Sequence, residues 1–292
     1  MSPSLLMTDP AAYQVAYAIN PWMDPSLWAS ADLENRRAAR RAWAGLRAAL
    51  EAAEAKILVM PGAEGAPDLV FPANAAVVLN GLAILAQFRA PERQVEEPHF
   101  AAAFARLKAK GVIADIATLP PGLFQEGAGD AIWDPVRQLI WAASGPRSSL
   151  EAPAEIGRLT GEAVVHMPLA TARYYHLDTC FCPLSGGEIL YYPPALSREA
   201  MAQLVAHTTA DQRLEASDAD AKAFCVNAVC LGRTIIMARP PARLAARLAE
   251  RGYQVVGVDL DPFILSGGGA FCMTLRLDHR SAAASARTRP AA

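Results

Sequence analysis

The chain has 292 residues, of which 53% are apolar and 19% charged, and its net charge is −2. This length allows a sizeable core in one large domain or two ordinary ones, and the composition excludes a disordered chain. The near-neutral charge without a basic run argues against a nucleic-acid partner. The absence of an 18-residue apolar run argues against a membrane helix.

The two ends and the cysteines suggest where the protein works. The start, "MSPSLLMTDPAAYQ", lacks the basic and apolar regions of a secretory signal. Five cysteines, an odd number, indicate free thiols in a reducing cytoplasm, which is the location we expect. Residues 280–292 are small and basic and contain a late proline, so we expect a disordered tail after a single domain of residues 1–279.

Helical patterns alternate with apolar strands along the chain. The first predicted helix covers residues 32–55 and leads into an apolar strand, "KILVM". Further helices are predicted at residues 96–111, 197–208 and 240–252. The last begins with proline and ends with glycine, as helices commonly do.

Five segments share one layout, in which a small polar motif precedes an apolar strand, a turn and, in most of them, a second strand. Their polar residues recur at a nearly fixed spacing: 52 residues from Asn74 to Glu126, 50 to His176, 51 to Asn227 and 45 to Cys272. The turns "NG", "DPVRQ", "SGG" and "GR" are typical of hairpins. A period of about 50 residues predicts an α/β fold, a five-bladed α/β-propeller with pseudo-fivefold ββαβ repeats. The alternative is an α+β domain in which hairpins and helices simply alternate.

Each repeat contributes at least one chemically active side chain, and a propeller would direct them all to its centre. They are Asp68, Asn74, Glu126, Asp130, His176, Asp178, Asn227 and Cys272. A thiol, an imidazole and carboxylates at matched positions supply a nucleophile, an acid–base group and a cradle for a cation. On the local sequence alone, Cys272 in "LSGGGAFCMTLRLD" is equally a small core residue beside a turn.

The motifs "YAINPWM", "EGAGD", "HLD" and "SGGGAFC", with Asp68, Phe71 and Asn74 as D-x-x-F-x-x-N, follow one another in a recognisable order. In this combination the chain resembles the guanidino-group-modifying superfamily with the five-bladed α/β-propeller (pentein) fold. Within it, the chain is similar to the dimethylarginine dimethylaminohydrolase-like branch and the related arginine dihydrolases. The resemblance covers residues 17–278.

The resemblance implies a cysteine-dependent hydrolase of an arginine-like guanidino group. Cys272 would attack the guanidino carbon and form a covalent thiouronium-type intermediate. His176 would protonate the leaving amine and then activate water, and Glu126 would hold the guanidinium by charge-assisted hydrogen bonds. No metal or organic cofactor is required. The C-x-C of Cys180 and Cys182 lacks a second ligand pair for zinc.

The resemblance also implies how the rest of the substrate is held. Arg93 and Arg147 correspond to arginines that bind the α-carboxylate. The alternative for each is a surface salt bridge, and Arg89 is close enough in sequence to exchange roles with Arg93. The remaining candidate substrate-binding residues are Asn20, Asp68, Asn74, Gly127 and Asp178. Asp130 would orient His176 or cap a turn, and we take Asn227 as mainly structural.

One departure bears on the reaction. Arginine deiminases and methylarginine hydrolases carry an aspartate where this chain has Asn74, whereas arginine dihydrolases resemble it in carrying asparagine. Asn20 also resembles a dihydrolase residue. We therefore favour hydrolysis of arginine to ornithine, ammonia and carbon dioxide over hydrolysis of dimethylarginine to citrulline and dimethylamine.

Two other functions of the superfamily stay open at this point. An amidinotransferase would use the same cysteine and pass the intermediate to an amine. A ribosome-associated translation factor shares the fold, but it would lack the site residues. We expect a small guanidino compound as the partner and neither nucleic acid nor membrane. Association into a homo-oligomer is left open.

Overall fold

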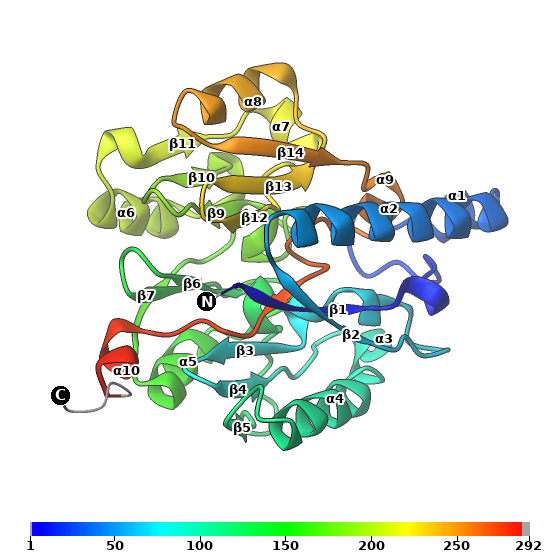
Figure 1. Ribbon diagram of the computed structural model, residues 1–292, viewed down its shortest axis with the longest axis horizontal. Coiled ribbons are helices and arrows are strands. Elements are labelled where there is room, and N and C mark those ends of the chain that lie inside the picture. The colour runs from blue at the N-terminus through cyan, green and yellow to red at the C-terminus, as the bar shows by residue number, and fades with distance from the viewer. Residues whose placement is uncertain (1, 288–292) are drawn as a thin grey trace.

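The computed structural model describes residues 2–287, in which short strands alternate with helices (Figure 1). The strands are β1 Ser4–Thr8, β2 Lys56–Met60, β3 Ala76–Leu79, β4 Leu82–Leu85, β5 Asp115–Ala117, β6 Ala131–Asp134, β7 Leu139–Ala142, β8 Ala163–His166, β9 Phe181–Pro183, β10 Ile189–Tyr191, β11 Arg213–Glu215, β12 Val229–Leu231, β13 Thr234–Ala238, β14 Gln254–Val258 and β15 Leu275–Arg276. The helices are α1 Pro25–Ala29, α2 Asp32–Ala52, α3 Pro91–Gln94, α4 Glu97–Ala109, α5 Ala152–Thr160, α6 Arg198–His207, α7 Asp218–Lys222, α8 Ala242–Ala249, α9 Asp261–Ile264 and α10 Ala282–Arg287.

Within residues 2–287 the strands form five three-stranded sheets with one common plan. In each, the first two strands pair antiparallel and the second pairs parallel with the third. A parallel pair needs a crossover connection, and helices such as α4 and α8 lie in these crossovers. The repeated plan agrees with the strand–turn–strand layout predicted from the sequence.

The fifth sheet joins the two ends of the chain. Strand β15 pairs antiparallel with β1, Leu5 facing Arg276, and β1 pairs parallel with β2, Ser4 facing Lys56. The sequence patterns predict β2 and a strand after Cys272, but not β1. Pairing of the first and last strands completes the fifth copy of the plan.

The predicted hairpin turns are confirmed by the backbone. Between β3 and β4, Asn80 and Gly81 both have positive φ angles, 56° and 82°. A two-residue hairpin loop of this kind requires positive φ at both positions, which asparagine and glycine tolerate best. The register Leu79 opposite Leu82 follows from this turn.

The helices lie around the outside of the sheets, with α8 next to β14 and α4 next to β4 and β5 (Figure 1). The four predicted helices correspond to α2, α4, α6 and α8. Helix α5 is not among the predicted helices. Among residues 2–287, no helix combines the length and apolar character needed to cross a membrane.

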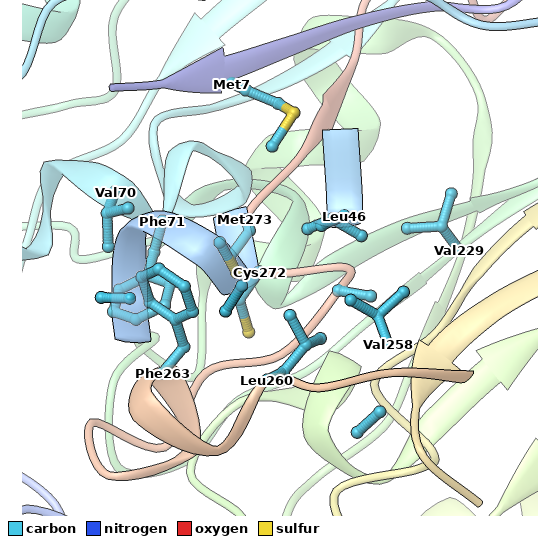
Figure 2. Packing of buried hydrophobic residues seen from close by; sticks show 14 of the residues in the cluster. Met7, Leu46, Val70, Phe71, Val229, Val258, Leu260, Phe263, Cys272 and Met273 are labelled. Carbon is cyan, nitrogen blue, oxygen red and sulfur yellow. The ribbon is translucent and has the colours of Figure 1, made fainter. Parts of the chain in front are cut away.

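Apolar side chains fill the spaces between neighbouring sheets and helices. One cluster joins α2, α9 and the strands around them, and Figure 2 shows Cys272 inside it, near Phe71, Phe263 and Met273. The thiol thus lies at the border between an apolar core and the polar residues described below.

The structure describes residues 280–287 of the segment that we expect to be a disordered tail. Residues 282–287 form helix α10, and the backbone N–H of Ser281 donates to the side chain of Asn80 (2.7 Å). Ser281 is buried. The small residues of this segment are good helix formers, and they follow a residue that is anchored on the β3–β4 turn. Residues 288–292 lie outside the described residues.

Candidate active site

The polar residues predicted to converge all lie in turns that precede the first strand of a sheet. Asn74 ends a 3-10 turn two residues before β3, and Asn227 lies two residues before β12. His176 and Asp178 lie just before β9, and Cys272 lies three residues before β15. Equivalent turns of equivalent sheets therefore bring together residues that are far apart in sequence.

Three buried residues form the thiol cluster: Cys272, Asp178 and Asn227. The Cys272 thiol donates to Oδ2 of Asp178 (3.1 Å) and accepts from the amide Nδ2 of Asn227 (3.1 Å). The Asn227 side chain also accepts the backbone N–H of Phe271 (3.0 Å) and of Cys272 (3.2 Å). Asn227 therefore fixes both the sulfur and the backbone that carries it.

A second buried group, the imidazole cluster, consists of His176, Glu126 and Arg147. Nε2 of His176 donates to Oε2 of Glu126 (2.8 Å), and Nη1 of Arg147 donates to the same oxygen (3.0 Å). Nδ1 of His176 lies 3.4 Å from the amide Nδ2 of Asn74. Because the carboxylate only accepts, we assign the imidazole proton to Nε2, which leaves Nδ1 as the acceptor.

One 3-10 turn connects the two clusters. It spans Leu177–Thr179, with His176 as its N-cap and Asp178 inside it. His176 reaches Glu126 and Asp178 reaches Cys272. A single turn thus carries both the imidazole and the carboxylate that contacts the thiol.

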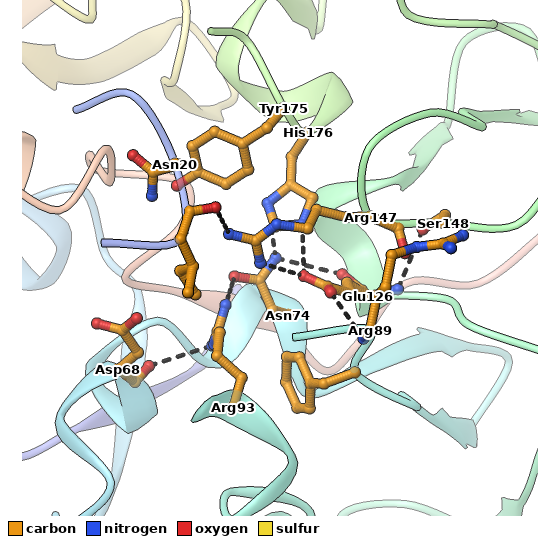
Figure 3. A network of polar contacts seen from close by, with 12 residues as sticks. Asn20, Asp68, Asn74, Arg89, Arg93, Glu126, Arg147, Ser148, Tyr175 and His176 are labelled. Carbon is orange, nitrogen blue, oxygen red and sulfur yellow. Dashed lines mark hydrogen bonds and ion pairs between the residues drawn. The ribbon is translucent and has the colours of Figure 1, made fainter. Parts of the chain in front are cut away.

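The two arginines expected to bind a substrate carboxylate already have partners in this structure. Arg147 stacks on Tyr175, with Cζ 4.8 Å from the ring centroid, and donates to the carbonyl of Ile19 (3.2 Å) (Figure 3). Arg93 forms a two-pronged pair with Glu96 (2.8 Å each) and donates to Oδ1 of Asn74 (2.9 Å). Both arginines are buried, so the alternative of surface salt bridges is wrong.

Known proteins share this arrangement of sequence and fold. Residues 17–278 match the family model described as N,N dimethylarginine dimethylhydrolase, eukaryotic. The chain belongs to this dimethylarginine dimethylaminohydrolase family.

Two curated relatives and one solved structure place the chain within the family. The bifunctional arginine dihydrolase/ornithine cyclodeaminase ArgZ of Synechocystis sp. is 39% identical over 94% of this chain. The chain spans only 37% of the length of ArgZ. The N(G),N(G)-dimethylarginine dimethylaminohydrolase of Mycobacterium tuberculosis is 34% identical, covering 93% of this chain and 84% of that protein.

The solved structure is the N-terminal domain of ArgZ, a cysteine-to-serine mutant bound to substrate. It superposes with a TM-score of 0.88 at 36% identity, covering 96% of this chain and 99% of that one. The resemblance stated from the sequence motifs is thus confirmed for the family and for the α/β fold.

The thiol cluster holds its thiol in the neutral form. Burial raises the pKa of Cys272 well above its usual value, and the neighbouring Asp178 carboxylate raises it further. Burial also raises the pKa of Asp178 to about 7, against the lowering effect of its hydrogen bond with Cys272. A positive charge placed beside the sulfur would favour the thiolate.

The imidazole cluster holds its carboxylate in the charged form. Burial would raise the pKa of Glu126, but Arg147 and His176 outweigh it and hold the pKa well below its ordinary value. Asp130 behaves differently, because burial raises its pKa to about 6 despite nearby His176. Glu126 is thus a permanent acceptor, whereas Asp130 changes its protonation state near neutral pH.

Other predicted residues lie at the edges of the two clusters. Asp68 is buried and accepts from the Tyr17 hydroxyl (3.1 Å), and Asn20 donates to the carbonyl of Ser266 (3.0 Å). Gly127 has φ +65°, and a Cβ there would come within 2.5 Å of the Ala73 carbonyl. Gly127 therefore permits the close approach of the turns that carry Glu126 and Asn74.

The two residues left open by the sequence now have defined contacts. Asp130 accepts from the Ser148 hydroxyl (2.6 Å) and from the backbone N–H of Leu177 (3.0 Å), so it supports the turn that follows His176. Its Oδ2 is 4.0 Å from Nε2 of His176. We expect Asn227 to be mainly structural, and the structure adds a contact between its amide and the Cys272 sulfur. Its place in the fourth repeat, matched with Asn74, was the signal that could have identified it.

Two further residues of the site were not predicted. Tyr175 stacks on Arg147, and its hydroxyl donates to the Gly267 carbonyl (2.8 Å). Glu96 neutralises Arg93, and no sequence motif distinguishes it from other helix-end glutamates. Among residues 2–287, no group of three or more His, Cys, Asp or Glu side chains is arranged to hold a metal ion.

Proposed function

We propose that this chain hydrolyses the guanidino group of free arginine, with Cys272 as nucleophile, and releases ornithine, two ammonia molecules and carbon dioxide. The five sheets would be the blades of a propeller, and residues 1–279 would act as one catalytic unit. The observation that carries the proposal is the pairing of a buried thiol and a buried imidazole through the single turn Leu177–Thr179.

The charges of the site favour a cationic substrate. Five buried carboxyl groups surround it, against two buried guanidinium groups: Asp68, Glu96, Glu126, Asp130 and Asp178 against Arg93 and Arg147. Among the described residues, Oδ1 of Asp68 and Oδ1 of Asp178 are buried without a hydrogen-bond partner. Buried oxygens of this kind call for a donor from a ligand. An arginine substrate carries two cationic donor groups, its guanidinium and its α-amino group.

The contacts of Arg147 suggest how the substrate binds. The Arg147 guanidinium lies on Glu126 and against Tyr175, which is the kind of site that a substrate guanidinium needs. We propose that the substrate guanidinium replaces it on Glu126 and that Arg147 turns to the substrate α-carboxylate. Asp178 would then accept a second guanidinium N–H, and Asp68 with Tyr17 would face the α-amino group.

The first half of the reaction makes the covalent intermediate. The substrate's positive charge lowers the pKa of Cys272, whose proton passes to a neighbouring acceptor. The sulfur adds to the guanidino carbon. The C–N bond then breaks. Nδ1 of His176, the nitrogen that Glu126 leaves free, takes up the proton lost by Cys272 and passes it to the leaving ammonia. In the second half, water adds to the carbon, His176 takes its proton, and the C–S bond breaks.

Asn74 is the residue we propose to decide between one and two hydrolyses. After the first hydrolysis the product is a neutral ureido compound, which a pair of carboxylates would hold poorly. The Asn74 amide is neutral and is oriented by Arg93 and by the backbone carbonyl of Glu126 (3.2 Å). It would accept and donate to a ureido group equally well, so the intermediate would remain bound for the second round.

The test is product analysis of the purified chain with L-arginine by mass spectrometry and an ammonia assay. We expect ornithine and about two ammonia molecules per arginine consumed. A parallel reaction with asymmetric dimethylarginine tests the alternative activity, favoured by the relative from Mycobacterium tuberculosis, through citrulline and dimethylamine. A third reaction with added glycine detects amidino transfer. Failure to consume any guanidino compound would overturn the proposal.

A further inference from the structure

A cavity of about 270 Å³ lies where the five sheets meet. Its wall includes residues from the first strand of every sheet, among them Val78 of β3, Ile132 of β6, Phe181 of β9, Cys230 of β12 and Leu275 of β15. Since every sheet contributes its first strand, the cavity follows their common axis. Its volume is enough for several water molecules.

The inner end of the cavity borders the candidate active site. Asp178, whose carboxylate accepts from the Cys272 thiol (3.1 Å), is part of the wall. Ala128 is also part of the wall, lies two residues after Glu126, and is only partly buried. The cavity therefore reaches both the thiol cluster and the turn of the Glu126 carboxylate.

The outer end of the cavity borders solvent. Pro135, Ser185 and Gly232 are part of the wall and are exposed, and Cys230 is partly exposed. Pro135, Ser185 and Gly232 lie in the turns that follow β6, β9 and β12, at the opposite ends of these strands from the site residues, and Cys230 lies within β12. The cavity thus extends from the candidate active site to the other face of the molecule.

The substrate's own side of the site is closed in this structure. Glu126, His176 and Arg147 are all buried. The Ile19 carbonyl accepts from Arg147 (3.2 Å), and the next residue, Asn20, donates to the Ser266 carbonyl (3.0 Å), so this segment packs against the buried arginine. A bound arginine that entered from this side would fill the remaining space with its amino-acid part.

The chemistry needs an exchange of small molecules while that side is blocked. This step rests on the proposed function. When the C–N bond breaks, ammonia is released beside an intermediate that is still joined to Cys272. One water molecule must then reach the same carbon before the C–S bond can break. Ammonia that stays in place can add back to the carbon and regenerate the substrate.

We propose that the axial cavity is a second route to the site, through which ammonia leaves and water enters while the covalent intermediate is in place. Ammonia is uncharged when the C–N bond breaks, and the largely apolar wall of valine, leucine and isoleucine side chains would not retain it. At the outer end, His279 is also uncharged at neutral pH, because burial and Arg276 lower its pKa to about 3. His279 therefore supplies no proton that would trap ammonia as ammonium at the outer end.

Narrowing the outer end tests this route. The test variant, Cys230→Trp, adds bulk to the wall of the cavity. One control, Cys230→Ser, changes the same residue and keeps the cavity open. The other, Val255→Trp, adds the same ring to β14 of the same sheet, away from the cavity. We expect Cys230→Trp to lower kcat for arginine at least tenfold, with more covalent adduct on Cys272 in acid-quenched samples analysed by intact mass. The Kd for arginine, measured in a Cys272→Ser background, should not change. The two controls should stay within about twofold of the wild type.

Each other outcome is decisive. Two results would overturn the second route while the proposed function stands. One is a kcat for Cys230→Trp within twofold of that for Cys230→Ser. The other is a lower kcat for Cys230→Trp without extra covalent adduct on Cys272. A wild-type chain that releases no ammonia from any guanidino compound overturns both. If Cys230→Trp does not fold, a benzyl methanethiosulfonate reagent adds the bulk to the folded wild type in the presence of arginine. The Cys230→Ala chain, treated in the same way, then shows how much inhibition comes from other thiols.

Discussion

The thiol cluster and the imidazole cluster are both buried, and each places a carboxylate against a reactive side chain. They differ in what neutralises that carboxylate. Glu126 has Arg147 in contact (3.0 Å), whereas no described hydrogen bond or ion pair joins Asp178 to an arginine or lysine. As a result the pKa of Glu126 is held well below its ordinary value, and burial raises that of Asp178 to about 7.

This difference shows which half of the site is complete without substrate. The imidazole cluster has its proton donor, acceptor and counter-charge in place. The thiol cluster lacks a positive charge, and burial with Asp178 keeps the thiol protonated. Under the proposed function, a substrate guanidinium would supply the missing charge, and the nucleophile would be activated only when substrate is bound. A buried, resting thiol is also protected from unwanted oxidation and alkylation.

The largest expected effect comes from removing the sulfur. Cys272→Ser should lower arginine turnover by at least about 1,000-fold, because a hydroxyl at this position has no base strong enough to ionise it. The measurement is ornithine and ammonia production at saturating arginine. Cys225→Ser, a buried thiol outside both clusters, should stay near the wild type. Equal activity of the two variants would remove Cys272 from the mechanism.

The second effect comes from removing the charge of the imidazole cluster. Glu126→Gln leaves Arg147 buried without its counter-charge, which should cost about 3–5 kcal/mol of unfolding free energy. It should also lower turnover by about 100-fold or more, because His176 loses the acceptor that fixes its proton. Urea denaturation and turnover assays measure the two losses.

The chain contains a matched exposed pair for this experiment. Arg47 pairs with Glu51 on α2 (2.8 Å), with 43% and 46% of the two side chains exposed. Glu51→Gln makes the same chemical change in water, where such pairs contribute little. A similar loss of stability in both variants would contradict the difference we draw between a buried and an exposed pair.

Much of the fold could be predicted because its signals are local. Two of these signals are short: the hairpin turn of Asn80 and Gly81 and the helical pattern of residues 32–55. The 50-residue spacing is the repetition of such short motifs along the chain. Strand β1 could not be predicted in this way. Its partners are β2 and β15, and the pairing of Leu5 with Arg276 joins positions 271 residues apart. Helix α10 depends likewise on the distant contact between Ser281 and Asn80.

In the candidate site, too, some features could be predicted from the sequence and others could not. The residue types and their repeat positions were visible in the sequence. The turns bring Asp178 into contact with Cys272 (3.1 Å) and Glu126 into contact with His176 (2.8 Å). The partners of each side chain were not visible. That Arg147 rests on Glu126 and that Asn227 contacts the sulfur depends on how five separate turns pack together.

Replacing Asn227 should have a smaller effect on turnover, because this residue contacts only the thiol cluster. Asn227→Ala removes the N–H donor on the sulfur and the acceptor of two backbone N–H groups, which should lower kcat by about 10- to 100-fold. Because that donor lowers the pKa of Cys272, the pH profile of iodoacetamide alkylation should move to higher pH. A purely structural role would leave this profile where it is.

The control for this prediction is a second asparagine that anchors backbone. Asn35 in α2 donates to the carbonyl of Trp28 (2.9 Å), far from the thiol in the sequence and outside both clusters. Asn35→Ala should change neither the alkylation profile nor kcat. An unchanged profile in Asn227→Ala would assign that residue to the scaffold alone.

The smallest expected effect tests the protonation state of the thiol cluster. The folded state raises the pKa of Asp178 to about 7 from the ordinary 3.8, so between these values the folded chain binds a proton more tightly than the unfolded chain. The stability contributed by this proton is present at low pH and is lost as the pH rises towards 7. Asp178→Asn cannot ionise, so it should gain about 1–2 kcal/mol relative to wild type between pH 5 and pH 8.

Asp278 is the control with the opposite sign. It is half-buried, and although burial would raise its pKa, the hydrogen bonds from Arg276 lower it below 3.8. Its contribution to stability is present above pH 4 and is lost only in more acidic solution. Asp278→Asn should therefore destabilise the chain equally at pH 5 and pH 8. Chemical denaturation of both variants at the two pH values separates them. A constant offset for Asp178→Asn would mean that Asp178 is charged throughout this range, and the thiol cluster would then be as ionic at rest as the imidazole cluster.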